Sequence, residues 1–393
     1  MRVNESAHVV LVGYGEMGTK SSSVRAKMEV RLRENLQAVL DDRSLSGRVE
    51  REWSRLLVRD TDDPEAVAAA CAEVPGVVWA RPSVVCDPTL DEIVAVCRDL
   101  AADHPADASF AIDEDRVGPK DAHDFSGRDI AREAGSAVVE VTGAPVDLDD
   151  PEVTYRVECR EDAAYVSVRR FDGPGGLPLG TQGKAVVLIS GGIDSPVAAW
   201  EMMRRGCEIV PVYVDLGDYG GADHRARALE TVRTIARRAP NFDLRVHVVP
   251  GDDVVQRLMD TIEDTRMLSL RRVMLSIAAT VAEDEHAHSI VTGESLGQKS
   301  SQTGENIAVT EAAVDYPVHR PLFTRDKTDI VTEAREIGTY DDSTLPVGCE
   351  RVAPSFPETN ASLSAVQAAE PDDLFELAAE AARNRRLVSV SQD

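Results

Sequence analysis

The sequence predicts two small α+β units followed by a larger α/β unit with a parallel sheet. Between residues 184 and 292, apolar strand-like runs alternate with helical segments over short connections. That rhythm is typical of a parallel sheet covered on both faces. Before it, strands and helices follow one another in the mixed order of α+β units. A turn-rich stretch, FDGPGGLPLGTQG at 171–183, marks the boundary between the two regions.

The first predicted unit spans residues 1–76 and has a ferredoxin-like order of elements. Its helix places Val24, Met28, Leu32, Leu36 and Val39 on one apolar face. In order, we expect a strand at 8–12, a helix at 24–40, a strand at 48–58 and a helix at 64–73, with the next strand at 77–86 completing the pattern.

The second unit, residues 77–171, is also predicted to be α+β. After its first strand we expect a helix at 89–103, a strand at 108–113, a helix opening near Ser126, and strands at 153–159 and 163–170.

The third unit, residues 172–393, carries the parallel sheet. Strands are predicted at 184–190, 208–214, 244–249 and 288–292, and helices at 196–205, 222–238, 252–263 and 268–285. Beyond residue 355 we expect irregular chain until a helix near 372–386, and a mobile end.

The composition predicts a protein of the cytoplasm with a surface adapted to high salt. The net charge is −26, and Lys contributes only six of the 43 basic residues. Acid excess spread along a chain is tolerated where salt screens self-repulsion. No apolar run is long enough to span a bilayer, and no leader precedes the first strand. The six Cys form no C-x-x-C pair, and His286 and His288 have no neighbouring Cys, so neither a disulfide framework nor a metal site is predicted.

Two glycine-rich stretches compete as a nucleotide site. VVLVGYGEMGTK at 9–20 contains Gly13, Gly15 and Gly18 in the G-x-G-x-x-G spacing of dinucleotide enzymes. However, Thr-Lys-Ser-Ser-Ser follows, which is a polar start for a helix that should pack tightly on a sheet. No acidic residue ends the next strand, which closes with Leu57-Val58-Arg59. The dinucleotide interpretation is therefore disfavoured.

The second stretch, LISGGIDSPVAAW at 188–200, places a glycine-rich turn between a buried strand and a helix with Pro196 in its first turn. Successive backbone N–H groups can converge there on an anion, supported by the helix N-terminus. The pattern is not a Walker loop. S-G-G-x-D-S resembles the pyrophosphate loop of the PP-loop ATP pyrophosphatases, which have an adenine-nucleotide alpha-hydrolase-like fold and split ATP into AMP and pyrophosphate.

Further motifs widen this resemblance. SLRRVM (269–274), TGESLGQKSSQT (292–303), RPLFTRDKTDIVTEAREIGTY (320–340) and LPVGC (345–349) follow in order, and YGEMGTKSSSVR (14–25) lies near the N-terminus. Together they resemble the ThiI family of tRNA 4-thiouridine synthetases, or tRNA sulfurtransferases, in the rhodanese-less archaeal type of a halophile. The resemblance implies that the second unit is a THUMP domain, which binds RNA.

The resemblance also implies the site residues. Catalytic roles fall on Asp194, Lys327 and Cys349, with Asp194 acting through Mg²⁺ or by orienting the reacting groups. ATP contacts fall on Leu188, Ile189, Ser190, Gly191, Gly192, Ser195, Tyr213, Val214, Arg271, Gly293 and Gln302. The basic residues best suited to tRNA are Lys20, Arg25, Lys27, Arg116, Lys120 and Arg128. Cys207 begins a predicted buried strand and is expected in the core.

The expected activity is adenylation of uridine-8 O4 by ATP followed by sulfur transfer, with a further role in thiamine synthesis through a sulfur-carrier protein. A homodimer is expected. No rhodanese domain follows the third unit, and RMLSLRRVM (266–274) lacks the C-x-x-C of some archaeal members, so the sulfur donor is either sulfide or a separate persulfide carrier. Two alternatives stay open: another PP-loop adenylating enzyme, and an RNA-binding protein with a degenerate nucleotide site.

Overall fold

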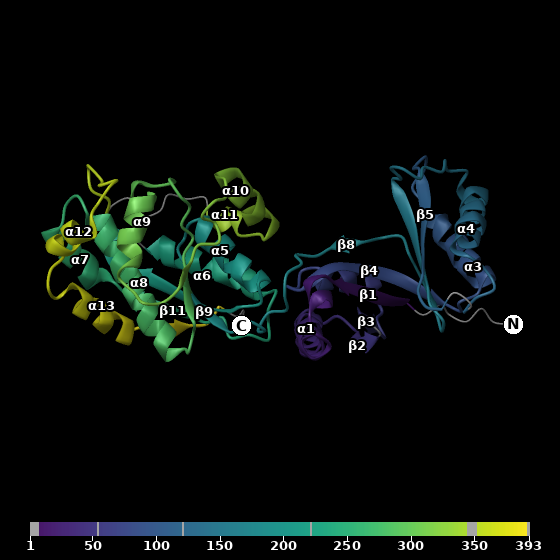
Figure 1. The fold of residues 1–393 in the computed structure, drawn as a ribbon, viewed down its shortest axis with the longest axis horizontal. Helices are drawn as coiled ribbons and strands as arrows, with labels where there is room; N and C mark the ends of the chain where they lie inside the picture. The colour runs from purple at the N-terminus through teal and green to yellow at the C-terminus, as the bar shows by residue number, and fades with distance from the viewer. Residues whose placement is uncertain (1–7, 53–54, 120–121, 221, 344–351, 391–393) are drawn as a thin grey trace. The chain divides into compact units, whose positions relative to one another are not determined.

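The computed structural model describes residues 8–52, 55–119, 122–220, 222–343 and 352–390. The chain forms two compact units, Met1–Gly176 and Leu177–Asp393. Each is described by itself below, with the elements labelled as in Figure 1. No helix in these ranges is long and apolar enough to cross a membrane.

The N-terminal unit is built on one eight-stranded sheet with the order β2-β3-β1-β4-β7-β6-β5, and β8 pairs with β4. The strands are β1 (His8–Tyr14), β2 (Arg48–Glu52), β3 (Arg55–Arg59), β4 (Val77–Cys86), β5 (Phe110–Arg116), β6 (Val153–Cys159), β7 (Ala164–Ser167) and β8 (Phe171–Asp172). The predicted single strand at 48–58 is wrong, because β2 and β3 are separate strands that pair antiparallel with each other. Strand β4 pairs with β1 along most of its length and with β7 at its end.

The helices of this unit are α1 (Ser22–Asp42), α2 (Pro64–Cys71), α3 (Leu90–Leu100) and α4 (Gly127–Thr142), with short 3₁₀ turns at Glu16–Thr19 and Ala101–Asp103. Local signals explain their ends. Ser126 and Asp129 form a capping box at the start of α4, and Gly143 ends that helix with φ 67°. Helix α1 buries Met28, Leu32, Leu36 and Val39 as expected, but Val24 is 41% exposed and does not belong to the apolar face.

The role of Gly13 is now clear. A Cβ at this position would lie 2.1 Å from Cε2 of Trp79, which is its partner across the β1–β4 ladder. Gly15 precedes the 3₁₀ turn at Glu16–Thr19, whereas in a dinucleotide-binding loop an α-helix would begin here. Gly13 therefore serves close packing within this sheet, whereas a Cβ at Gly18 would meet no atom within 4 Å; this agrees with the rejection of a dinucleotide loop.

The C-terminal unit contains a six-stranded sheet with the order β13-β12-β9-β10-β11-β14. All pairs are parallel except the last, in which β14 runs antiparallel to β11. The strands are β9 (Lys184–Leu188), β10 (Glu208–Asp215), β11 (Val246–Pro250), β12 (Ser289–Val291), β13 (Val318–His319) and β14 (Arg386–Val388). Strand β14 completes the sheet at a place where the sequence suggested the end of a helix at 386 followed by a mobile end; residues 391–393 of that expected mobile end lie outside the described residues.

Helices cover both faces of this sheet. They are α5 (Asp194–Arg204), α6 (Ala222–Ala236), α7 (Asp252–Thr261), α8 (Arg266–Asp284), α9 (Gly304–Glu311), α10 (Lys327–Glu336), α11 (Tyr340–Ser343), α12 (Leu363–Ala369) and α13 (Leu374–Arg383). Ala185 and Val187 pack toward α5, α6 and α10, whereas Val186 packs toward α7, α8 and α13. This alternation gives the predicted two-sided core. Helix α12 lies in a stretch that was expected to be irregular.

Candidate functional site

A cavity of about 340 Å³ lies at the carboxyl ends of β9, β10 and β12 in the C-terminal unit. This is the edge at which ligands bind in open α/β sheets. The structure places all the predicted ATP contacts around it, together with Asp194: Leu188, Ile189, Ser190, Gly191, Gly192, Ser195, Tyr213, Val214, Arg271, Gly293 and Gln302. Among these predicted contacts, Leu188 and Gln302 are 114 positions apart in the chain, and both line this cavity.

The loop after β9 is held by its own two serines. The Ser190 backbone N–H donates to Ser195 Oγ at 2.8 Å, and the Gly192 N–H donates to Ser190 Oγ at 3.3 Å. Helix α5 begins at Asp194, so its first N–H groups face the same loop. A partial positive charge at a helix N-terminus favours a bound anion. The serine contacts therefore fix the shape of the loop, and the N-terminus of α5 is the part that favours a phosphate group beside it.

Gly293 fixes the distance between this loop and the segment after β12. A Cβ at position 293 would lie 2.8 Å from the Ser195 backbone N and 2.8 Å from the Asp194 carbonyl C. Only glycine permits so close an approach of two backbones.

Lys327 reaches the site through an ion pair. It is the first residue of α10, and its Nζ lies 2.5 Å from Asp194 Oδ1. The two side chains are 45% and 25% exposed, so both can also meet a ligand. The structure thus joins the two predicted catalytic residues that it describes. Cys349 and Lys120 lie outside the described residues.

Arg271 is held on three sides. Its Nε donates to Ser301 Oγ at 2.9 Å, and one terminal nitrogen donates to Glu294 Oε1 at 2.5 Å. In the orientation that satisfies both polar atoms of its carboxamide, Gln302 accepts from Arg271 at 3.1 Å and donates to Ser295 O at 2.8 Å. A guanidinium fixed in this way is preorganised for a ligand group.

Glu294 was not among the predicted site residues. It is 4% exposed, and its Oε2 accepts from Arg320 Nε at 2.8 Å and from Thr292 Oγ1 at 2.9 Å. Burial acts to raise the pKa of Glu294, but the charges of Arg271 and Arg320 outweigh it and hold that pKa below the usual range. An acidic residue directly after a strand end was the available signal, but its two arginine partners are not visible in the sequence.

Replacing Glu294 by glutamine is expected to destabilise the protein by about 3 kcal/mol at neutral pH and to raise the KM for ATP, because two arginines lose a buried counter-charge. Since the pKa of Glu294 is lowered in the folded state, its contribution is present above the unfolded pKa and is lost as the pH falls below about 4. Thermal unfolding of the wild type and the variant from pH 7 downward measures the loss of stability and its pH dependence, and assays with varied ATP measure the KM.

Glu311→Gln is the matched control, because Glu311 also pairs with Arg320 but its side chain is 47% exposed. Equal melting temperatures of the two variants at pH 7 would contradict the role assigned to Glu294.

The predicted tRNA residues lie in the N-terminal unit. Lys20 lies just before α1 and Lys27 within it, and both are exposed. Arg25 of α1 pairs with the buried Glu29 at 3.7 Å. Arg116 ends β5 and lies 5.8 Å from the centre of the Phe125 ring, whereas Arg128 is exposed at the start of α4. The structure brings the first three together on one segment, apart from the other two.

The remaining expectations concern cysteine, histidine and metal. Cys207 is 5% exposed in the core, and burial raises the pKa of its thiol. His286 and His288 are both exposed. Within the ranges that the structure describes, no three His, Cys, Asp or Glu side chains are grouped so that they could hold a metal ion.

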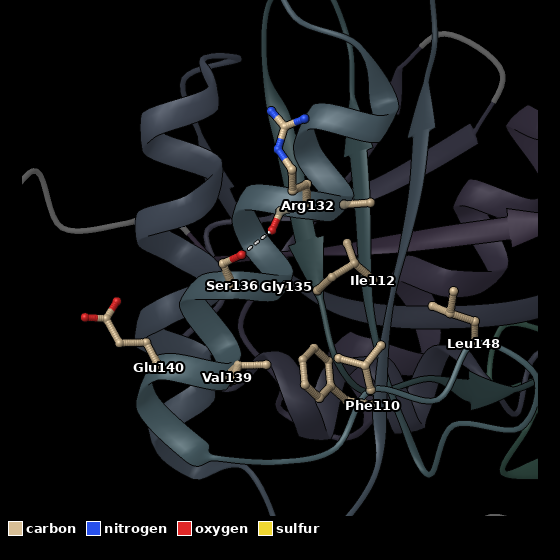
Figure 2. Close-up of a pocket in the computed structure, with 10 residues that line it drawn as sticks. Phe110, Ile112, Arg132, Gly135, Ser136, Val139, Glu140 and Leu148 are labelled. Carbon is tan, nitrogen blue, oxygen red and sulfur yellow. Dashed lines mark hydrogen bonds between the residues drawn. The ribbon is translucent and has the colours of Figure 1, made fainter.

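A second cavity, of about 460 Å³, lies between β5 and α4 of the N-terminal unit. Figure 2 shows that its wall is mainly apolar, with Phe110, Ile112, Val139 and Leu148 directed toward it. None of the predicted site residues lines it. The groups suited to phosphate chemistry are therefore those of the C-terminal cavity.

Comparisons with known proteins agree with this architecture. Residues 9–80 match the family described as "ThiI ferredoxin-like domain", residues 88–169 match "THUMP domain", and residues 180–375 match "Thiamine biosynthesis protein (ThiI)".

Relatives resemble the chain over nearly its whole length. A protein of Halobacterium salinarum named "Probable tRNA sulfurtransferase" is 50% identical over 98% of both chains. One of the same name from Methanosarcina acetivorans is 39% identical over 90% of this chain and 87% of its own. The solved structure titled "Crystal structure of a 4-thiouridine synthetase - RNA complex with bound ATP" is similar with a TM-score of 0.86 and 28% identity, covering 97% of this chain and 99% of that one. The chain therefore belongs to the ThiI family of tRNA sulfurtransferases.

Proposed function

We propose that this protein is an ATP-dependent tRNA sulfurtransferase that converts uridine-8 of tRNA to 4-thiouridine. The observation that carries the proposal is the cavity at the strand ends, where an anion-binding loop, the Asp194–Lys327 pair and the braced Arg271 meet. Family membership and a similar synthetase solved with RNA and ATP support it.

The proposed reaction has two steps. Uridine O4 attacks the α-phosphorus of ATP, pyrophosphate leaves, and the base becomes adenylated. A sulfur nucleophile then attacks C4 and displaces AMP. In the first step the N-terminus of α5 and the loop before it hold the departing pyrophosphate, and Lys327 offsets charge that develops at the α-phosphate. Where a persulfide protein is the source, Cys349 is the proposed sulfur carrier: its thiolate takes the outer sulfur of the donor persulfide and the donor thiol leaves. That outer sulfur then attacks C4, and an external thiol releases 4-thiouridine by forming a mixed disulfide with Cys349. Sulfide, the other source, would attack C4 directly.

Mg²⁺ belongs to the proposal as the companion of ATP. The cavity wall contains two carboxylates, and Glu294 is already committed to two arginines. Asp194, which also pairs with Lys327, is the carboxylate that would hold the ion together with the phosphates of ATP, since Mg²⁺ often takes only one or two protein carboxylates in such sites. When bound, it would neutralise charge on the leaving pyrophosphate.

The proposed division of labour follows three parts of the chain. Residues 1–76 and 77–171 handle tRNA, and residues 172–393 carry out the chemistry. A homodimer, a cytoplasmic location, and sulfide or a separate persulfide carrier as sulfur source complete the proposal. The description of the matching family as a thiamine biosynthesis protein supports a role in thiamine synthesis, for which we propose sulfur transfer to a carrier protein.

Mass spectrometry of tRNA nucleosides from a deletion strain tests the main claim. We expect 4-thiouridine to disappear and to return when the wild-type gene is restored. The Cys349→Ser gene should restore no 4-thiouridine, although the purified variant should still release pyrophosphate. Persistence of 4-thiouridine in the deletion strain would refute the proposed function.

A pyrophosphate assay separates the two alternatives. Release that responds to small acceptors but not to tRNA would indicate another PP-loop adenylating enzyme. Tight tRNA binding without any tRNA-dependent release would indicate an RNA-binding protein with a degenerate nucleotide site.

A further inference from the structure

One face of the N-terminal sheet is not covered by helices. On the other face, strand residues such as Tyr155 and Val157 pack in one cluster with residues of α3 and α4. The face without helices has a separate apolar cluster, none of whose members belongs to a helix: Val9, Leu11, Leu57, Tyr165, Trp79, Val85 and Ala163. Within the described residues of this unit no helix packs on this side of the sheet, which is called the open face below. Its apolar cluster is itself buried, with Val9, Leu11, Leu57 and Tyr165 at most 3% exposed, so the groups that can meet a partner are the partly exposed charged side chains around it.

Three arginines gather on this open face. Arg81 follows Trp79 by two residues on β4, so both point the same way, and its Cζ lies 4.6 Å from the centre of the Trp79 ring. Arg156 alternates with the helix-facing Tyr155 and Val157 on β6. Arg170 precedes β8, in which Asp172 is the cross-strand partner of Trp79.

The three guanidinium groups are close enough to repel one another. Burial, together with the charges of Arg156 and Arg170, lowers the pKa of Arg81 to about 10. Burial and the charge of Arg170 also lower the pKa of Arg156. Such a cluster is unfavourable by itself, because its charges are crowded without being fully neutralised.

Of the three arginines, Arg81 alone forms no ion pair with a described residue, although the charge of Asp172, which pairs with Arg170, also acts on it. Arg156 pairs with Asp113, and Arg170 pairs with Asp172 at 2.6 Å. Elsewhere on the face Arg55 pairs with Glu158 and Arg59 with Glu52. Arg81 makes no ion pair with any residue whose placement is described. The chain as a whole has a net charge of −26, so a crowded group of arginines, one of them without an ion pair to a described residue, is opposite in charge to the rest of the protein.

We propose that Arg81, flanked by Arg156 and Arg170, is a phosphate-binding site through which the open sheet face holds the RNA backbone. The guanidinium fork of arginine matches two oxygens of a phosphodiester, and stacking on Trp79 keeps the Arg81 fork in place. A bound phosphate supplies the missing negative charge. The inference rests on the proposed tRNA substrate and adds a contact surface outside the predicted tRNA residues.

Binding of an unmodified tRNA transcript to the full-length protein over a series of KCl concentrations tests this site. Arg81→Ala should weaken binding about five- to tenfold and reduce the slope of log K against log salt by about one, as expected for one lost phosphate contact. Arg170→Ala, which removes a half-exposed side chain and is not expected to affect folding, should weaken binding in the same direction. Arg81→Lys should recover part of the affinity.

Arg132→Ala is the matched control. It removes the same charge from the helix α4, where Arg132 pairs with Asp129 and Glu133, and its affinity and salt slope should equal those of the wild type. The KM for ATP should not change in any of these variants, because all of the substituted residues lie outside the ATP cavity.

The inference is overturned if wild-type protein binds tRNA and both Arg81→Ala and Arg170→Ala bind it with unchanged affinity and slope. It is also overturned if polyglutamate binds the wild type but not Arg81→Ala while Arg81→Ala binds tRNA normally. The face would then recognise an acidic protein. Wild-type protein that binds no tRNA would overturn the proposed function as well, so the two failures are distinguishable.

Discussion

Lys327→Ala is expected to lower tRNA-dependent pyrophosphate release by about 10²–10³-fold while tRNA binding is unchanged. Lys327 Nζ lies 2.5 Å from Asp194 Oδ1, at the start of the helix that supports the pyrophosphate loop. Its removal leaves developing phosphate charge unopposed and frees Asp194 from its partner. Steady-state assays with saturating tRNA and varied ATP should show the loss mainly in kcat.

Lys184→Ala is the control for this experiment. Lys184 is at the opposite end of β9 and lies 3.7 Å from both Glu208 and Glu285, so the substitution removes an equal charge away from the cavity. It should retain wild-type turnover. If Lys327→Ala and Lys184→Ala are equally active, Lys327 has no electrostatic role in the reaction.

Gly293→Ala is expected to weaken ATP binding by at least about 10²-fold. The added Cβ would lie within 2.9 Å of three backbone atoms of Asp194 and Ser195, and backbone cannot move aside as a flexible side chain can. Either the pyrophosphate loop or the segment after β12 must shift, and both line the cavity. Isothermal titration calorimetry with ATP measures the effect directly.

Gly304→Ala provides the comparison, since a Cβ there meets no atom within 4 Å and the residue begins helix α9. We expect its ATP affinity to stay within threefold of the wild type. Near-normal ATP affinity in Gly293→Ala would mean that the two backbones separate freely and that their close approach has no part in binding.

Local patterns were sufficient to predict the elements that position the site. The buried run ending at Leu188, the glycine turn and Pro196 define a strand, an anion loop and a helix within about 20 residues, and the structure contains them in that order. Capping residues such as Ser126 likewise place a helix start to within one residue. In these cases the deciding interactions are short-range, so the sequence contains them directly.

Features that depend on distant partners were missed. Glu294 owes its place to Arg271 and Arg320, which approach it from different elements. Strand β14 was missed, where the sequence suggested the end of a helix at 386 and then a mobile end, because it is stabilised by pairing with β11, about 140 residues earlier. Val24 follows the helical period of the apolar face, yet its side chain is 41% exposed. Periodicity describes one element and says nothing of where its neighbours end.

The shared strand β4 limits how the N-terminal unit can be divided in the laboratory. Val77–Val84 pair with β1, and Val84–Cys86 pair with β7, so the strand belongs to both halves of the sheet. A fragment ending at residue 76 would expose the edge of β1, and a fragment starting at 77 would expose the edge of β4, which invites aggregation. The two halves of this unit should instead melt in a single transition. They are not separately folding pieces, and a fragment for binding studies has to include residues 1–176.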